Sequence, residues 1–285
     1  MLHGLFCTPD TAQCQLAERV GLFMRQLQEA GCPEVVTVQE ANAATVALIE
    51  PLLDACGYGL VWDGDPGMDR ELVLTVVTAV DSRRIPLAGG VRSAYIVRLD
   101  SELGGVDLVS AHLASARDNR ACDPATCPPP CDAADELRAC QVRQVLQAVG
   151  ELASSDIVAL AGDFNAMPGD PAYQLVVDAG FVDSHLAAGR EECTADTPAS
   201  CTVGRDDSSM TDLTDPASRQ DARIDYVFIA PLPPRCAIGG ATGPFNAEPA
   251  QGPIAYPSDH TAVMSTLTCS PSEGHSATTF PPATV

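Results

Sequence analysis

The architecture of this chain can be worked out from one segment, Ile157-Val158-Ala159-Leu160-Ala161-Gly162-Asp163-Phe164-Asn165. Its apolar start predicts a short strand buried on both faces, as in the interior of an α/β protein. Side chains two positions apart share a face while the chain stays extended, so Asp163 and Asn165 should point together into a cleft. A simple Asp/Asn turn explains these residue types but not the buried strand before them.

Apolar periodicity on both sides of this segment predicts an alternation of helices and strands. A first helix is expected to begin near Leu16 and to stop at Gly31, and a second to run from the N-cap Asn42 to Gly57 with Leu52 facing inward. Two more are expected over 135–152 and over 173–179. Strands are expected at 35–40, 58–62, 72–80, 93–99, 106–112, 223–229 and 261–268. The polar residues 184–221 read as a surface loop. The mixture predicts one α/β sandwich domain over 1–269, followed by a disordered Ser/Thr/Pro-rich tail, 270–285.

The charge of the chain is strongly negative. Its 285 residues include 16 basic and 38 acidic side chains, giving a formal net charge of −22, and every basic residue is Arg. Such a surface repels polyanions, which argues against passive nucleic-acid binding through a basic patch. A bound metal and a few Arg side chains can still reverse the field locally. No apolar run is long enough to span a membrane.

Twelve cysteines indicate disulfides and an oxidising compartment. A zinc site at Cys122, Cys127, Cys131 and Cys140 is the alternative, although this cluster is looser than most zinc-ligand spacings. We expect a secreted or periplasmic protein. Met1 leads into no cationic start or apolar stretch of a signal peptide, so we expect a mature or truncated form.

Several further polar residues stand at the ends of apolar strands. Glu40 ends one strand and can bind a hard cation through its oxygens, unless it is only a solvated terminus. His112 ends another, where a structural His is the simpler reading. Asp225 lies inside an apolar strand and needs a partner, because an unpaired buried carboxylate is costly. His260 is a natural partner, since an Asp raises the basicity of a His and fixes its tautomer. The adjacent Asp259 can contact a metal.

Five motifs in this order resemble the endonuclease/exonuclease/phosphatase superfamily: Gln39-Glu40, Ser110-Ala111-His112-Leu113, Gly162-Asp163-Phe164-Asn165, Arg223-Ile224-Asp225-Tyr226 and Ser258-Asp259-His260. Pancreatic-type deoxyribonucleases and bacterial sphingomyelinases belong to this superfamily. The resemblance implies a four-layer α/β sandwich, with two mixed sheets face to face and helices outside. It also implies a phosphoesterase that depends on Mg²⁺ or Mn²⁺ and uses no organic cofactor.

The resemblance also implies roles for the individual residues. Glu40 would bind the metal, with Asp259 as an additional ligand. Asp163 would position or deprotonate the attacking water, and Asn165 would hold the phosphate. His112 would stabilise phosphate charge or protonate the leaving group, while Asp225 would orient His260 as base.

Two places depart from the superfamily pattern. Members normally open with a strand that ends in an Asn, and here Met1-Leu2-His3-Gly4 stands where that strand should end, so we expect the strand and its Asn to lie upstream. On the strand beginning near Arg70, some members place an acidic partner for the first His. Glu71 is then a candidate partner for His112 and Arg70 a candidate phosphate ligand, against the simpler reading of a salt-bridged loop.

The substrate is expected to be a phosphate ester: a nucleic acid, a phospholipid or a small ester. A nuclease is favoured over a sphingomyelinase or phospholipase C-like enzyme, since no aromatic loop stands out for docking to a membrane. A catalytically degenerate binding module of the same fold is the alternative from another class. No stable protein partner is implied.

Overall fold

The computed structural model describes residues 15–62, 70–90, 92–123, 125, 127–132, 135–205, 211–239, 243–245 and 248–270. Its helices are α1 (Leu16–Glu29), α2 (Ala43–Ile49), η1 (Glu50–Ala55), α3 (Leu137–Leu152), α4 (Pro171–Asp178), α5 (Ser184–Ala187), η2 (Pro198–Ser200) and α6 (Thr211–Thr214). Its strands are β1 (Val35–Ala41), β2 (Gly59–Trp62), β3 (Arg70–Thr75), β4 (Thr78–Pro86), β5 (Ser93–Ser101), β6 (Gly104–His112), β7 (Ile157–Asp163), β8 (Val182–Asp183), β9 (Asp225–Ile229), β10 (Cys236–Ile238), β11 (Gly243–Phe245), β12 (Ala262–Met264) and β13 (Leu267–Cys269).

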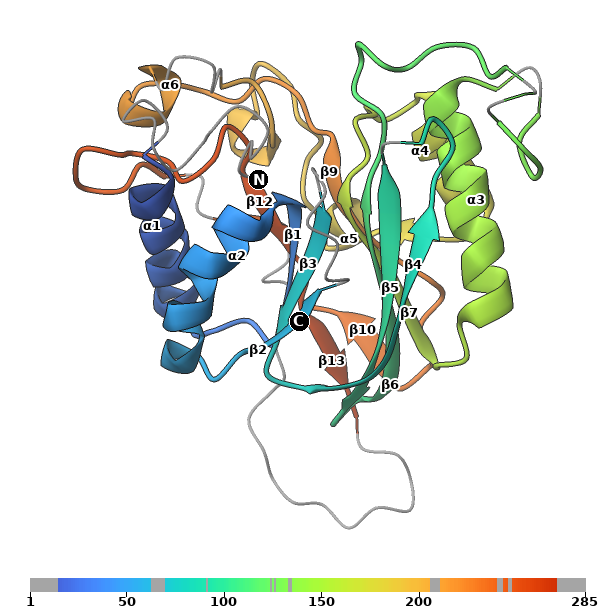
Figure 1. Cartoon of the computed structure of the whole chain (residues 1–285), viewed down its shortest axis with the longest axis horizontal. Helices are drawn as coiled ribbons and strands as arrows, with labels where there is room; N and C mark the ends of the chain where they lie inside the picture. Colours follow the sequence, from blue (N-terminus) through green and yellow to red (C-terminus); the bar gives the residue numbers. More distant parts are fainter. Residues whose placement is uncertain are drawn as a thin grey trace.

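These elements form four layers, which confirms the expected α/β sandwich (Figure 1). A six-stranded sheet, in the order β4-β5-β6-β7-β9-β8, is mixed because β6 and β7 run parallel. A three-stranded sheet, β1-β3-β2, faces it, together with the pairs β10-β13 and β11-β12. Helices α1 and α2 cover one outer side and α3 and α4 the other.

Three apolar clusters fill the spaces between these layers. One packs α1 and α2 against β1 and β3, and includes Phe23 and Leu72. A second lies between the two sheets and includes Val73 and Leu108. The third packs α3 and α4 against the six-stranded sheet. The second cluster joins the two sheets, and the helices cover their outer faces, so the central strands are buried on both faces.

The apolar segment 72–80 is two strands rather than the single strand that we expected. The chain bends at Val76 and Val77, so that β3 stays in one sheet while β4 enters the other. The Thr75 hydroxyl donates to the carbonyl of Val77 and accepts from its amide, which stabilises the bend. Because residues 72–80 on both sides of the bend are mostly apolar, hydropathy alone hides the change of sheet.

Three other expectations need correction. The expected strand 261–268 is divided into β12 and β13. Leu52 is exposed rather than inward, because Pro51 lacks an amide hydrogen and the helix continues as the 3₁₀ helix η1. Part of the expected loop 184–221 is helical, in α5, η2 and α6. The N-cap Asn42 is confirmed, since its side chain accepts a hydrogen bond from the amide of Thr45.

Disulfides pair all ten cysteines in the described part of the chain, which accords with the prediction. The pairs are Cys32–Cys56, Cys122–Cys127, Cys131–Cys140, Cys193–Cys201 and Cys236–Cys269. The four cysteines of the zinc alternative thus form two neighbouring disulfides, which leave no thiolate to bind zinc. Met1–Gly4, the remaining cysteines and residues 271–285 lie outside the described residues. Among the described helices, none has the length and apolar character of a membrane span.

Candidate active site

The strand register brings three of the predicted residues into one row across the six-stranded sheet. His112 ends β6 and is paired with Asp163 at the end of the parallel strand β7. Asp163 is in turn paired with Asp225, the first residue of the antiparallel strand β9. Neighbouring strands lie about 4.8 Å apart, so this register alone places the three side chains close together. The row lies where β6 and β7 end and β9 begins, and so at one end of the six-stranded sheet.

Asp225 and His260 form the predicted pair. The Nδ1 atom of His260 lies 2.9 Å from Oδ2 and 3.1 Å from Oδ1 of Asp225. Since a carboxylate can only accept, the proton of a neutral His260 ring is on Nδ1, and Nε2 is left facing the site. The Oδ2 atom of Asp259 lies 3.7 Å from that Nε2. The amide of His260 donates to Ser258 Oγ, which helps to fix the backbone.

Asp163 and Asn165 also lie together as predicted, although the chain between them does not stay extended. Asn165 has a φ of +50°, in the left-handed region that Asn tolerates better than most residues. This turn directs its amide 2.7 Å from Oδ1 of Asp163 and its side-chain nitrogen 3.1 Å from Oδ2. The same side-chain nitrogen donates to the carbonyl of Leu113. Asn165 therefore fixes the orientation of the Asp163 carboxylate.

His112 contacts an arginine that the sequence did not indicate. An Nη1 atom of Arg92 lies 2.8 Å from Nδ1 of the ring. A guanidinium can only donate, so Nδ1 accepts, and the proton of the neutral ring is on Nε2. That Nε2 lies 3.4 Å from Asp163 Oδ2 and 4.0 Å from Glu40 Oε1. Burial lowers the pKa of His112, and so does the charge of Arg92, although Asp163 opposes them.

Glu40 reaches this group through a β-bulge. Val38 is opposite Leu72 and Ala41 is opposite Arg70, so two residues of β1 face one residue of β3. Glu40 has a φ of +61°, a conformation uncommon for a residue other than Gly. The bulge brings its carboxylate near Nε2 of His112.

Glu71 is buried near this group, and its side chain hydrogen-bonds to Ser110 and Gln39. It is 3% exposed, and its Oε2 accepts from the hydroxyl of Ser110 at 2.5 Å. Gln39 donates to that same Ser110 oxygen at 3.0 Å and also hydrogen-bonds to Glu71. Burial raises the pKa of Glu71 to about 7, even though His112 and these hydrogen bonds lower it. The Nδ1 position of His112 is taken by Arg92 instead, and the Arg70 side chain lies outside the described part of the structure.

The arrangement of acidic groups fits a divalent cation. One potential ligand atom each from Asp163, Asp225 and His260 lies within 4.8 Å of the others. The pKa of Asp163 is raised because it is buried and because Asp225 carries a like charge. Burial lowers the pKa of His260, but the charges of Asp225, Asp163 and Asp259 outweigh it and raise the pKa to about 10. Clustered carboxylates of this kind favour a positive charge among them, and their oxygens suit Mg²⁺ or Mn²⁺.

The position of Arg92 follows from a hairpin that sequence reasoning overlooked. Ser101 pairs with Gly104 across the two-residue turn between β5 and β6. This register sets Ala94 opposite Ala111, and continuing it by one residue brings Ser93 to the level of His112, next to Arg92. Reading Ser101–Gly104 as a tight turn would have placed Arg92 beside His112 from the sequence.

A sequence profile of the Endonuclease/Exonuclease/phosphatase family matches residues 15–260, while no curated protein matches the chain. Similar solved structures include a humanised TDP2 from D. rerio, 22% identical, covering 87% of this chain and 91% of that one with a TM-score of 0.63. A mannosyl-6-phosphatase from Bacteroides thetaiotaomicron is 16% identical over 88% and 91%, with a TM-score of 0.59. A family protein from Leptotrichia buccalis is 15% identical over 92% and 95%, with a TM-score of 0.58. At these identities the likeness concerns the fold.

Proposed function

The chain belongs to the Endonuclease/Exonuclease/phosphatase family of phosphate-ester hydrolases, and we propose that it is a secreted, divalent-metal-dependent phosphodiesterase. The observation that carries this proposal is the row of His112, Asp163 and Asp225 on three adjacent strands, completed by the bond from Asp225 to His260. A purely structural role would not need two like charges on neighbouring strands, one of them the buried Asp163, because they cost free energy unless they are compensated.

In the proposed mechanism, water attacks phosphorus opposite the leaving oxygen. Asp163, held at both oxygens by Asn165, accepts a hydrogen bond from this water and positions it. His260 takes up or releases a proton at Nε2, and Asp225 stabilises the charged ring through Nδ1. His112 donates from Nε2 toward a phosphoryl oxygen, since Arg92 holds its proton on that side.

Glu40 and Asp259 are the residues that we propose to hold the metal, beside the carboxylates of the row. When bound, a divalent cation neutralises charge that develops on the phosphoryl oxygens. Asp259 is suited to this because its Oδ2 lies 3.7 Å from His260 Nε2, the ring nitrogen that Asp225 does not bind. Glu40 is suited because the bulge brings it to the His112 side of the same group.

We propose a nucleic acid as the first substrate to test. One similar structure is a D. rerio TDP2 complexed with a single-stranded DNA product, which supports a site of this fold that accepts a DNA phosphate. The net charge of −22 opposes long-range attraction of DNA. Any nuclease activity should therefore depend on cations at the site and show a high KM.

The disulfides support the secreted part of the proposal. Five pairs in the described residues stabilise loops and strand ends, and such pairs persist in oxidising compartments. Alkylation of the unreduced protein by iodoacetamide, followed by intact-mass measurement, tests this. Protein isolated from its native compartment should gain no mass at the ten described cysteines, whereas alkylation there would contradict the proposal.

The test of function is hydrolysis of bis-(p-nitrophenyl) phosphate with Mg²⁺ or Mn²⁺, with and without EDTA. We expect metal-dependent release of nitrophenol that falls about 100-fold or more in Asp163→Asn. The matched control is Asp156→Asn, which alters an exposed Asp just before the other end of β7 and should keep full activity. Preferential turnover of p-nitrophenyl phosphate would instead indicate a phosphomonoesterase. No turnover of either ester, DNA or sphingomyelin by folded, metal-loaded protein would overturn the proposal.

A further inference from the structure

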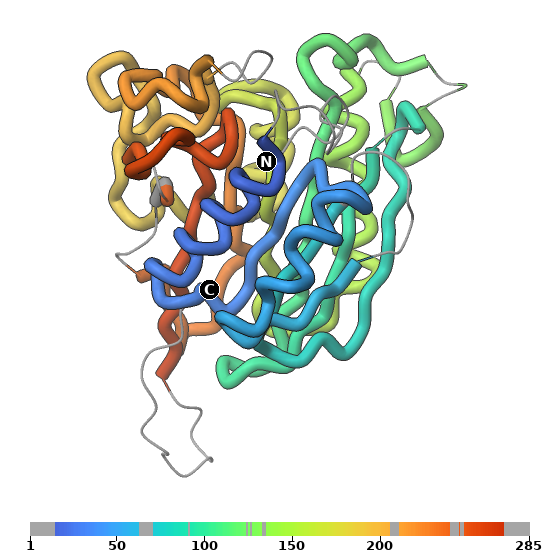
Figure 2. Tube along the Cα trace, turned by 60° about the vertical axis from the view of Figure 1, so that its left-hand side comes forward, coloured from blue at the N-terminus to red at the C-terminus, as the bar shows by residue number. Residues whose placement is uncertain are grey.

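One buried threonine joins the two segments that carry Asp225 and His260. The side chain belongs to Thr202, which is 0% exposed. Its hydroxyl oxygen accepts hydrogen bonds from the amides of Ile224 and Asp225, at 3.1 and 3.2 Å. Its carbonyl accepts from the amide of Thr261, the residue after His260, at 2.7 Å. Figure 2 shows the gold segment of the chain beside the orange and red C-terminal segments.

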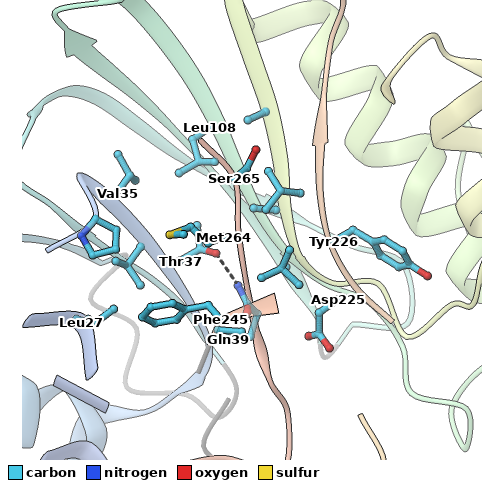
Figure 3. Close-up of a pocket in the computed structure, with 18 of the residues that line it drawn as sticks. Leu27, Val35, Thr37, Gln39, Leu108, Asp225, Tyr226, Phe245, Met264 and Ser265 are labelled. Atoms are coloured by element: carbon cyan, nitrogen blue, oxygen red, sulfur yellow. Dashed lines mark hydrogen bonds between the residues drawn. The ribbon is translucent and has the colours of Figure 1, made fainter. Parts of the chain in front are cut away.

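The start of β9 needs such a contact because β8 does not extend along it. Within the described structure, β8 pairs with β9 only at Phe228 and Ile229, at the far end of the strand. Backbone amides that are removed from water normally have a hydrogen-bond partner. At the start of β9 the hydroxyl of Thr202 takes that place. The backbone that carries Asp225, labelled in Figure 3, is therefore held by this side chain as well as by β7.

The Cys193–Cys201 disulfide connects Thr202 to a second contact near the same strand. Cys201 directly precedes Thr202 and is 1% exposed. Cys193 directly follows Glu192, whose two carboxylate oxygens accept hydrogen bonds from the guanidinium of Arg223, just before β9. The disulfide thus joins a contact before β9 to a contact at its start, and it closes the mostly exposed loop between them.

We propose that Thr202 is a positioning residue for the Asp225–His260 pair and that the Cys193–Cys201 disulfide keeps it in place. The 2.9 Å bond of this pair joins two segments that are 35 residues apart in the sequence, and Thr202 hydrogen-bonds to both. A shift of one segment against the other would lengthen the bond, and hydrogen bonds weaken as their geometry departs from the optimum. Thr202 acts through the pair, so only the catalytic readout below rests on the proposed function.

The first test removes the Thr202 hydroxyl and keeps the shape of the side chain. Thr202→Val should lower kcat for bis-(p-nitrophenyl) phosphate about tenfold and change KM less than about twofold, because the pair acts in proton transfer. Thr202→Ser retains the hydroxyl and should recover kcat to within about threefold of the parent protein. The matched control is Thr268→Val, the same change at an exposed position of β13, which should keep the parent kcat.

The second test observes the pair itself, in metal-free protein and without turnover. The proton on Nδ1 of His260 should give a downfield proton NMR signal in the parent protein, because Asp225 accepts its hydrogen bond. His260→Gln assigns this signal by removing it. We expect the signal to remain in Thr202→Ser and to be lost in Thr202→Val.

The third test removes the disulfide and leaves Thr202 unchanged. Replacing Cys193 and Cys201 by Ala should lower kcat about tenfold and weaken the His260 signal. The control replaces Cys32 and Cys56 by Ala, which removes a disulfide beside the cluster under α1 and α2. That variant should keep the parent kcat and the parent signal. If Thr202→Val does not fold, the cysteine variants decide the question.

Three results would overturn the proposal. They are a His260 signal of parent strength in Thr202→Val and in the Cys193/Cys201 variant, a fall in kcat without any change in this signal, or no recovery in Thr202→Ser. If the parent protein hydrolyses no ester, the His260 signal alone decides. Failure of this proposal and failure of the proposed phosphodiesterase are therefore distinguishable.

Discussion

Replacing Glu71 by Gln should remove a loss of folding stability that the protein undergoes as the pH rises. Glu71 is 3% exposed between the two sheets, and burial raises the pKa of its carboxyl from 4.5 to about 7. Its oxygen accepts from Ser110, and the Gln side chain retains an oxygen in a similar place. The variant therefore removes the ionisation with little change in shape.

The sign follows from the direction in which the pKa moves. The folded state holds the Glu71 proton more tightly than the unfolded state, so the stabilising effect is fully present below pH 4.5. It is lost as the pH rises through about 7. A folded-state pKa that is higher by 1 than the unfolded-state pKa corresponds to about 1.4 kcal/mol. The free energy of unfolding should therefore fall by about 3 kcal/mol over this window from Glu71 alone.

The assay is urea unfolding in EDTA, under oxidising conditions, at several pH values from 4 to 8.5. The quantity to plot is the difference in free energy of unfolding between Glu71→Gln and the parent protein, which cancels other titrating groups. It should rise by about 3 kcal/mol in favour of the variant as the pH increases. Glu29→Gln, at an exposed position of α1, serves as the control with a flat difference. A flat difference for Glu71→Gln itself would refute the reasoning.

Three further predictions concern the site and the disulfides. Asp225→Asn should lower kcat/KM for bis-(p-nitrophenyl) phosphate about 10²- to 10⁴-fold with an unchanged circular dichroism spectrum, since His260 loses its charged partner; full activity would contradict the pairing. Arg92→Met should lower kcat about tenfold, because without Arg92 the proton of the neutral His112 ring is no longer held on Nε2. Arg92→Lys should recover part of the activity. NMR of the ring nitrogens shows which nitrogen carries the proton, and an unchanged signal in Arg92→Met would contradict this role. Replacing Cys236 and Cys269 by Ser should lower the free energy of unfolding, measured in urea, by about 3–4 kcal/mol, because their disulfide closes a loop with a sequence separation of 33 and so restricts the unfolded chain. A decrease below about 1 kcal/mol would argue against this entropic account.

Sequence reasoning works where a polar residue adjoins an apolar strand. Asp163 and Asp225 stand out because a carboxylate beside buried residues needs compensation, and the structure puts them on paired strands. His260 could be assigned to Asp225 for the same reason, since only a partner justifies that carboxylate. These inferences use local pattern and the cost of buried charge, both of which the sequence carries.

Other features depend on which strands are neighbours, and periodicity does not carry that information. The bend at Val76–Val77 lies within continuous apolar sequence, so nothing marks the passage from one sheet to the other. Arg92 resembles any loop arginine until the β5–β6 register sets it beside His112. The partner of Glu71 could not be chosen either, because Ser110 and His112 lie on the same strand two residues apart.

The bulge in β1 resolves a conflict between the regular alternation of side chains along a strand and the position of Glu40 beside His112. Regular alternation would turn Glu40 to the same side as Val36 and Val38, which pack into the apolar cluster under α1 and α2. A carboxylate there would be buried without a partner. The extra residue opposite Glu71 redirects Glu40 toward His112, while Gln39 keeps its bond to Ser110 between the sheets. The positive φ of Glu40 costs about 1–3 kcal/mol, which is less than the cost of burying its charge without a partner, and the strained backbone places Glu40 in the site.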